Sequence, residues 1–416
     1  MNIYKFGGAS VNSAQAVENM AAIVRRHSGS PLVVVVSAMG KTTNLLERLV
    51  PGVNPPDQQA ALFSQLADYH HSIAEQLFRN PAHPVFNQLE LLLAQLRHQI
   101  ALPPSSYNFD YDQTVSFGEL ISTTIISAYL NRLGICNQWI DIRNVITTDH
   151  NYREGHVDWT LTEQKAQAAF TGNDLFVTQG FIAGTTDHHT TTLGREGSDY
   201  SAAILSFCLH AEQMTIWKDV PGFLNADPKY FHDTIKIKQI PYNEAIELAY
   251  YGASVIHPKT VKPIQNRNIS LHIKSFINPE ETGSVIGPFE SIIPQTPLYI
   301  FKNNQILISI LPKDFSFIAE DNLQTIFAAL ATLNIKVNLM QNSALSFSIC
   351  VDNNDILVDQ LTALLQDQFL IRYNKGLQLI TIRYYTQQII DSIVNQRAIL
   401  LQQRSRTTTQ IICAQE

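Results

Sequence analysis

Residues 32–37 read Leu32-Val33-Val34-Val35-Val36-Ser37, a mostly β-branched run that is typical of a strand buried on both faces of a parallel sheet. Upstream, residues 3–6 predict a short strand, Gly7-Gly8-Ala9-Ser10 predicts a turn, and residues 13–27 predict a helix with one apolar face. The order strand, glycine turn, helix, strand predicts an α/β fold.

The composition limits the classes of protein to which the chain can belong. Its 416 residues are enough for two or three domains. The formal net charge of −7 offers no basic surface for nucleic acid or an anionic membrane, although local positive loops still allow an anionic small substrate. No signal peptide or membrane span is recognisable. Four separated cysteines without a C-x-x-C pair indicate reduced thiols in a cytoplasmic protein: Cys136, Cys208, Cys350 and Cys413.

A polar loop follows the buried strand. Its Gly40-Lys41-Thr42 sequence suggests a Walker A phosphate loop, but the first glycine of that motif would fall at Val35, inside the strand. The Walker interpretation therefore fails. Ser37 and Thr43 still place hydroxyl groups at the carboxyl end of a strand, where α/β sheets bind ligands.

Two helical regions come next. Residues 57–100 predict a helical hairpin that turns at Pro81–Pro84, and its histidines lack metal-ligand spacing with a carboxylate. A second long helix is predicted from Thr114, and it places Glu119 on an apolar face. Because a buried carboxylate is costly without a cation, two interpretations stay open: an internal salt bridge, or a clamp for the ammonium group of a substrate.

The stretch Thr190–Ala203 is a dense group of polar side chains. It is predicted as a loop with two glycines that runs into a helix, with Ser198 or Asp199 as the N-cap. Backbone N–H groups at such a helix start suit an anion. Before it, residues 176–182 predict a strand, and residues 187–189 predict an exposed hairpin tip.

The later part of the chain contains a long loop, and its secondary-structure pattern changes after residues 288–297. Residues 218–229 form a Pro/Gly-rich loop, too long for a simple connection, which makes it a candidate nucleotide-binding loop. Beyond residues 288–297 we predict α+β structure and place a domain boundary near residue 292. Strands are expected at 305–311, 336–340, 346–351, 377–384 and 408–413, and helices at 321–333, 355–365 and 387–403.

Six motifs resemble the aspartate kinase family in order and spacing. They are residues Lys5–Val11, Ser37–Asn44, Ser116–Leu120, Gly194–Asp199, Asp219–Gly222 and Gly252–Pro258. The resemblance covers nearly the whole chain. It implies an amino-acid-kinase-like three-layer sandwich with a mainly parallel sheet in residues 1–291. It also implies an α+β regulatory region in residues 292–416, with two ACT-type units of which the second is short.

The resemblance further implies an activity and a set of site residues. The reaction is phosphorylation of the side-chain carboxylate of L-aspartate by ATP with Mg²⁺, giving 4-phospho-L-aspartate, the first step towards lysine, threonine and methionine. Because the acceptor is already ionised, no general base is required. Lys5 is expected to stabilise charge on the moving phosphoryl group, and Asp199 to orient that lysine or Mg²⁺. Aspartate is expected to contact Thr43, Glu119, Arg195 and Ser198. ATP is expected to contact Gly7, Gly8, Ser37, Lys218, Asp219, Leu224, Lys229 and Ser254, and to carry Mg²⁺ without help from protein side chains.

Some positions depart from the family pattern. Ala9 replaces a threonine of the family pattern. Ser254 replaces a lysine that normally helps to hold ATP, and Lys218 or Lys259 is a candidate for that role. Asn338 and Ala344 replace acidic residues often found in lysine-inhibited relatives. Lysine, threonine, another ligand or none therefore stay open as regulators.

Two alternative functions are set against aspartate kinase. A glutamate or acetylglutamate kinase has the same fold, but Glu119 disfavours acetylglutamate, whose nitrogen carries no charge. The other alternative is a catalytically weak amino-acid sensor that acts through its ACT domains. Because ACT domains generally pair across chains, at least a homodimer through residues 293–416 is expected.

Overall fold

The computed structural model describes residues 1–27, 31–172, 174–253, 255–314 and 316–415, and it divides into two compact units. The first unit comprises Met1–Phe223, Lys236–Ile246 and Val255–Pro294. The second comprises Leu224–Ile235, Glu247–Ser254 and Gln295–Glu416. Ser254 itself, one of the predicted nucleotide contacts, lies outside the described residues.

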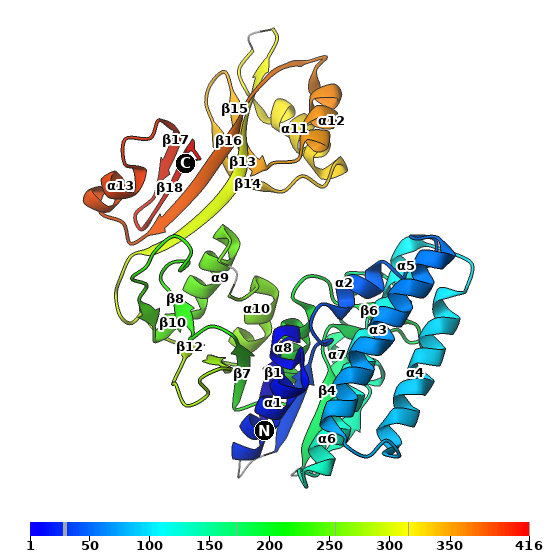
Figure 1. The fold of residues 1–416 in the computed structure, drawn as a ribbon. Helices are drawn as coiled ribbons and strands as arrows, with labels where there is room; N and C mark the ends of the chain where they lie inside the picture. Colours follow the sequence, from blue (N-terminus) through cyan, green and yellow to red (C-terminus); the bar gives the residue numbers. More distant parts are fainter. Residues whose placement is uncertain (28–30, 173, 254, 315, 416) are drawn as a thin grey trace. The chain divides into compact units, whose positions relative to one another are not determined.

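A mainly parallel eight-stranded sheet forms the centre of the first unit (Figure 1). Its strands, in spatial order, are β10 (Gln239–Pro241), β12 (Ser284–Gly287), β11 (Ser270–Ser275), β7 (Gln213–Lys218), β1 (Asn2–Phe6), β2 (Leu32–Val36), β4 (Leu175–Gln179) and β3 (Gln138–Ile140). Only the β11–β12 pair is antiparallel within this sheet. Every residue of β2 is buried, as its run of valines predicted.

Helices cover both faces of this sheet. One apolar core joins Phe6, Val34 and Val36 to α1 (Ala14–Arg26), α3 (Pro56–Leu77), α4 (Pro84–Ile100) and α6 (Phe117–Arg132). On the other face α8 (Gly197–Cys208) packs on β1 and β7 and contacts α7 (Trp159–Ala169) and α10 (Pro258–Asn266). Because successive strand residues point to opposite faces, Phe6 enters the first core while Lys5 points towards α8.

Shorter elements complete the first unit. They are η1 (Gly8–Val11), α2 (Thr42–Glu47), α5 (Tyr107–Val115), η2 (Ile142–Asn144), β5 (Ile182–Gly184), β6 (Thr190–Thr192), β8 (Phe223–Leu224), β9 (Lys236–Ile237) and α9 (Tyr242–Tyr251), of which β8 and α9 run on into the second unit. The helical hairpin predicted at 57–100 is confirmed as α3 and α4. The single helix predicted from Thr114 is wrong, because Ser116 ends α5 and begins α6. Its hydroxyl donates to the carbonyl of Gln113 at 3.0 Å.

An antiparallel six-stranded sheet organises the second unit (Figure 1). Its strands, in spatial order, are β14 (Val337–Asn342), β15 (Phe347–Asp352), β13 (Leu298–Pro312), β16 (Phe369–Arg383), β18 (Thr408–Ala414) and β17 (Ile399–Arg404). One core joins β13 to α11 (Glu320–Thr332) and α12 (Asp355–Leu365), and another joins β16 and β18 to α13 (Gln387–Val394). The α+β pattern expected for this part of the chain is therefore confirmed.

The helix predicted at 387–403 is half wrong. It ends at Val394, because Asn395 and Gln396 adopt left-handed conformations with φ of 42° and 64°. Residues 399–404 instead form β17, which pairs with β18. None of the helices in the described part of the chain combines the length and apolarity that a membrane span requires.

Candidate active site

A cleft of about 860 Å³ opens in the first unit beside the carboxyl ends of β1, β2 and β4. Seven of the predicted site residues line it together with Asp199 at the start of α8: Lys5, Gly8, Ser37, Thr43, Glu119, Arg195 and Ser198. The cleft thus collects side chains from segments almost two hundred residues apart in the chain. This is the place where open parallel sheets bind their ligands.

An ion pair joins the sheet to α8 at the floor of the cleft. The Nζ of Lys5 lies 2.6 Å from Oδ1 of Asp199, whose side chain is fully buried, and the Nζ of Lys218 lies 3.6 Å from Oδ2. Burial alone would raise the pKa of Asp199, but the two ammonium groups outweigh it and hold that pKa below its ordinary value. The carboxylate therefore stays ionised and fixes the position of the Lys5 ammonium group.

The predicted helix cap at Ser198 or Asp199 is wrong. The helix α8 begins at Gly197, and its N-cap Glu196 has a left-handed φ of 54° with no capping hydrogen bond from a side chain. Asp199 lies in the first turn and is turned towards Lys5. The ion pair with the buried Lys5 ammonium group takes the place of a capping hydrogen bond at the helix start.

The glycine turn after β1 packs against the loop after β2. The amide of Gly40 donates to the carbonyl of Gly8 at 3.0 Å. A Cβ added to Gly8 would lie 2.8 Å from the carbonyl oxygens of both Ala38 and Gly40. Only glycine therefore fits where these two loops meet at the cleft.

Replacing Gly8 by alanine is expected to lower the free energy of unfolding by about 1–3 kcal/mol, because two backbone segments must move apart. Urea denaturation checks this value. Gly7→Ala is the matched control, since the nearest atom to its new Cβ would be the Nζ of Lys5 at 3.4 Å, an ordinary van der Waals distance. Equal destabilisation by both substitutions would contradict the packing argument.

Glu119 offers one buried oxygen to a ligand. Its Oε1 accepts a hydrogen bond from the amide of Ala38 at 3.1 Å, while Oε2 is buried and has no partner among the described residues. Burial raises the pKa of Glu119 to about 8, against the opposing effects of the Ala38 amide and the Lys5 charge. No described residue forms an ion pair with Glu119, so the clamp for an ammonium group is favoured over the internal salt bridge.

Arg195 stands at the mouth of the cleft. Its side chain is exposed, and no described residue forms an ion pair with it. The next turn brings Ser198 so close to Gly180 that a Cβ on Gly180 would lie 2.7 Å from the Cβ of Ser198. The α8 start is thus held against the end of β4, and Arg195 is free to pair with an anion.

The family resemblance implies that Arg195 pairs with the α-carboxylate of aspartate. On this expectation, replacing Arg195 by alanine should raise KM for aspartate about 10- to 100-fold with a much smaller change in kcat, because a charge-assisted pair with the bound ground state would be lost. Arg195→Lys should recover only part of the loss, since lysine cannot form a bidentate pair. Steady-state kinetics with aspartate and ATP varied separately test this. A change confined to KM for ATP would place Arg195 at the nucleotide.

The remaining predicted nucleotide contacts that the structure describes do not line the cleft. Gly7 caps η1 beside it, and Asp219 is exposed after β7. Lys218 reaches the site through Asp199 and donates a hydrogen bond to the Val255 carbonyl at 2.6 Å. Leu224 and Lys229 belong to the second unit. Their nucleotide contacts stay predictions.

One wall of the cleft has no counterpart in the sequence analysis. It consists of Asn108, Tyr111 and the loop residues Asn151–Glu154. Buried Asp112 ties this wall to β6: it accepts from the amide of Arg153 at 2.8 Å and from the amide and hydroxyl of Thr192 at 3.0 and 2.7 Å. The Arg153 guanidinium lies 4.4 Å from the ring centre of Tyr111. In the sequence, the polar segment that contains Tyr152 and Arg153 was the one feature that could have indicated this wall.

Comparison with known proteins agrees with this geometry. A model of the Amino acid kinase family matches residues 1–275. Lysine-sensitive aspartokinase 3 of Escherichia coli is 32% identical over 84% of this chain and 78% of its own length. A bifunctional aspartokinase/homoserine dehydrogenase 1 of Arabidopsis thaliana is 32% identical over 68% of this chain, which spans 32% of that larger protein.

The fold comparison extends over the whole chain. The crystal structure of E. coli aspartokinase III in complex with aspartate and ADP superposes with a TM-score of 0.83 at 26% identity, covering 100% of this chain and 96% of that one. The predicted fold class, an amino-acid-kinase-like sandwich followed by ACT-type α+β structure, is thereby confirmed. The chain belongs to the amino acid kinase family and, within it, to the aspartokinases.

Proposed function

We infer that the protein is an aspartate kinase, which transfers the γ-phosphoryl group of ATP to the side-chain carboxylate of L-aspartate. The product is 4-phospho-L-aspartate, the first intermediate on the route to lysine, threonine and methionine. One observation supports this most directly: the buried, unpartnered Oε2 of Glu119 shares a cleft with exposed Arg195 and with the Lys5–Asp199 pair. Glu119 complements the ammonium group of an amino acid, and Arg195 complements its α-carboxylate. Lys5 complements the negative charge of the reacting groups.

Some residues of the cleft bind aspartate, and others stabilise the charge that develops on the phosphoryl group. Glu119 binds the α-ammonium group and Arg195 the α-carboxylate, with Thr43 and Ser198 completing the aspartate pocket. The side-chain carboxylate of the substrate attacks without a general base, since it is ionised at neutral pH. Lys5, held by Asp199, faces the negative charge that spreads over the phosphoryl group during transfer.

We further propose that ATP approaches the glycine turn. Backbone N–H groups at Gly7 and Gly8, the Ser37 hydroxyl and the Lys218 ammonium group are proposed to bind its phosphates. Mg²⁺ would be held by the phosphates of ATP, where it neutralises part of their charge. Asp219, Leu224, Lys229 and Ser254 are proposed as contacts to the rest of the nucleotide. The resemblance to an aspartokinase solved with ADP supports this assignment.

The second part of the chain is proposed to regulate the first. Residues 1–291 would form the catalytic domain and residues 292–416 the ACT-type region, through which the chain would pair as a homodimer. E. coli aspartokinase 3 is lysine-sensitive. In this chain Asn338 donates to Gln305 and Asp352 at 2.8 and 2.9 Å, within the sheet. Titration with lysine and threonine decides which amino acid, if either, is the ligand.

The reaction is tested by trapping the acyl phosphate with hydroxylamine in the presence of ATP and Mg²⁺. L-Aspartate should give hydroxamate, while L-glutamate and N-acetylglutamate should not. Signal with glutamate instead would make the protein a glutamate kinase. An amino acid that binds tightly without any turnover would identify a sensor.

A further inference from the structure

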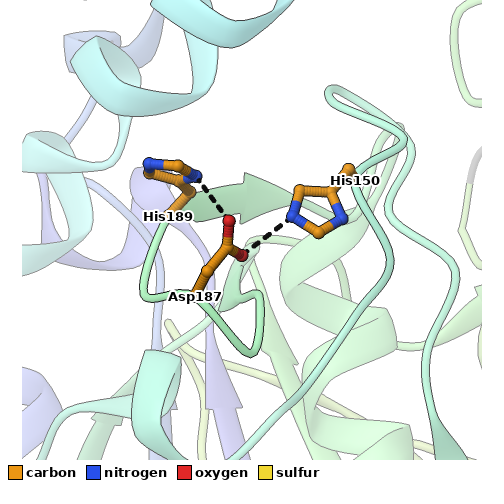
Figure 2. Close-up of side chains that lie close together, drawn as sticks. All are labelled: His150, Asp187 and His189. Carbon is orange, nitrogen blue, oxygen red and sulfur yellow. Dashed lines mark hydrogen bonds and ion pairs between the residues drawn. The ribbon is translucent and has the colours of Figure 1, made fainter.

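A cluster of two histidines and one carboxylate lies on the surface of the first unit, apart from the lining of the cleft (Figure 2). Nε2 of His150 lies 2.8 Å from Oδ1 of Asp187, and Nδ1 of His189 lies 3.3 Å from Oδ2. One ligand atom from each residue lies within 4.8 Å of the other two. The three side chains come from two loops, and Asp187 stands between the two imidazole rings.

The turn that carries Asp187 and His189 is well ordered by its own hydrogen bonds. The amide of Thr185 donates to the carbonyl of His189 at 2.9 Å, and the amide of His189 donates to the Thr185 hydroxyl at 3.0 Å. His188 between them has a left-handed φ of 65°, which closes the turn between β5 and β6. The ring of Phe109 packs edge-on against His189 with centroids 5.3 Å apart. Two of the three groups are therefore held in place by the fold.

We propose that His150, Asp187 and His189 bind one zinc-class divalent transition-metal ion. Two imidazoles and a carboxylate are a ligand set that zinc accepts, with the fourth position left to water because the site is open to solvent. The separations of 2.8 and 3.3 Å run to the two different oxygens of Asp187, and one ligand atom from each residue lies within 4.8 Å of the other two. Ligand atoms around one tetrahedral zinc lie about 3.3 Å apart, so rotation of the side chains would have to draw the three atoms closer to a common centre.

The donor set determines which metal ions the site can prefer. Asp187 offers a carboxylate, and His150 and His189 each offer an imidazole nitrogen. Neutral imidazole is the form of histidine that ligates metal. Mg²⁺ prefers oxygen ligands and is not expected to compete.

A metal ion here would tie down the loop that forms one wall of the cleft. His150 directly precedes Asn151–Glu154, which line the cleft, and the amide of Asp149 donates to the carbonyl of His156 at 3.1 Å, closing the loop at its base. Asp187 and His189 lie on the hairpin whose strand β6 contributes Thr192 to the same cleft. The metal would therefore be a structural clamp between two segments of that wall, and it takes no part in phosphoryl transfer.

The test is titration of the untagged full-length protein with Co²⁺, followed by its visible absorption, and then displacement by Zn²⁺. Wild type is expected to bind one ion per chain, with binding unchanged in excess Mg²⁺. His150→Asn, Asp187→Asn and His189→Asn should each weaken binding more than about tenfold. Zn²⁺ should raise Tm of the wild type and leave Tm of these variants unchanged.

Two neighbouring histidines provide matched controls. His188→Asn should keep the metal, because asparagine tolerates the left-handed conformation and His188 is not a ligand. His156→Asn should also keep it, because His156 pairs with Asp149 instead, at 2.8 Å. The proposal is overturned if wild type binds no more Co²⁺ than the triple variant of the three ligands, or if a control substitution removes the ion. Neither outcome depends on whether the protein phosphorylates aspartate.

Discussion

Replacing Lys5 by alanine is expected to lower kcat by about 10³-fold, because the ammonium group that faces the developing phosphoryl charge is removed. The same substitution leaves the fully buried Asp199 with only the more distant Lys218, 3.6 Å away. A buried carboxylate that loses its close partner destabilises a protein by about 3 kcal/mol or more. Loss of activity and loss of stability therefore have to be separated.

The double variant Lys5→Ala/Asp199→Asn separates them. It removes both members of the pair that lie 2.6 Å apart, so no charge is left buried without its close partner. Urea denaturation should show most of the stability restored, while hydroxamate formation should stay as low as in Lys5→Ala. Recovery of activity together with stability would mean that Lys5 has a structural role only. Asp199→Asn alone should lower kcat less than Lys5→Ala does.

Replacing Glu119 by glutamine is expected to raise KM for aspartate about 10- to 100-fold, because a charge-assisted contact with the ammonium group is lost. The shape of the side chain is nearly kept, so the amide of Ala38 retains its acceptor. The free protein should become more stable at alkaline pH, since no buried charge has to be formed. The substitution should therefore weaken aspartate binding and at the same time stabilise the free protein.

The pH dependence follows from the raised pKa of Glu119, about 8 against an ordinary value of 4.5. The folded protein holds this proton where the unfolded chain has released it, so the contribution to stability is fully present below pH 4.5 and is lost as pH rises through about 8. In the proposed site the ammonium group of aspartate pairs with the ionised form of the Glu119 carboxylate. Its KM should therefore fall about tenfold per unit as pH rises from 6 towards 8.

Two measurements check this behaviour. KM for ATP in the wild type is the internal control and should not share the slope, because Glu119 is not among the residues proposed to contact ATP. In Glu119→Gln the slope for aspartate should disappear, and Tm above pH 8 should exceed that of the wild type. A slope that persists in the variant would assign the titration to another group.

Much of the fold is readable from local sequence. The valine run of β2 can be buried on two faces only in a parallel sheet covered by helices, and the segment has that environment. The motifs around Lys5, Ser37, Glu119 and Arg195 contain the cleft residues because each follows or faces the carboxyl end of a strand. These features depend on residues close together in the chain.

Other features depend on partners far away in the sequence. Residues 399–404 follow a helical pattern, yet they form a strand because β18 offers hydrogen bonds and Asn395 ends the helix. Asp199 has the sequence position of a helix cap, yet a lysine 194 positions earlier in the chain, at 2.6 Å, draws it into an ion pair. Local propensity differs by fractions of a kilocalorie per residue, and a buried charge pair or a strand ladder outweighs it.

The sequence by itself determined the family, the α/β sheet and the side chains expected to meet aspartate. The tertiary structure decided which oxygen of Glu119 is left without a partner, which residues form the wall around Arg153, and which histidines meet Asp187. His150 and His189 carry no spacing that a sequence pattern reveals, because separate loops hold them. Only folding brings those two loops close together, and sequence spacing does not encode that proximity.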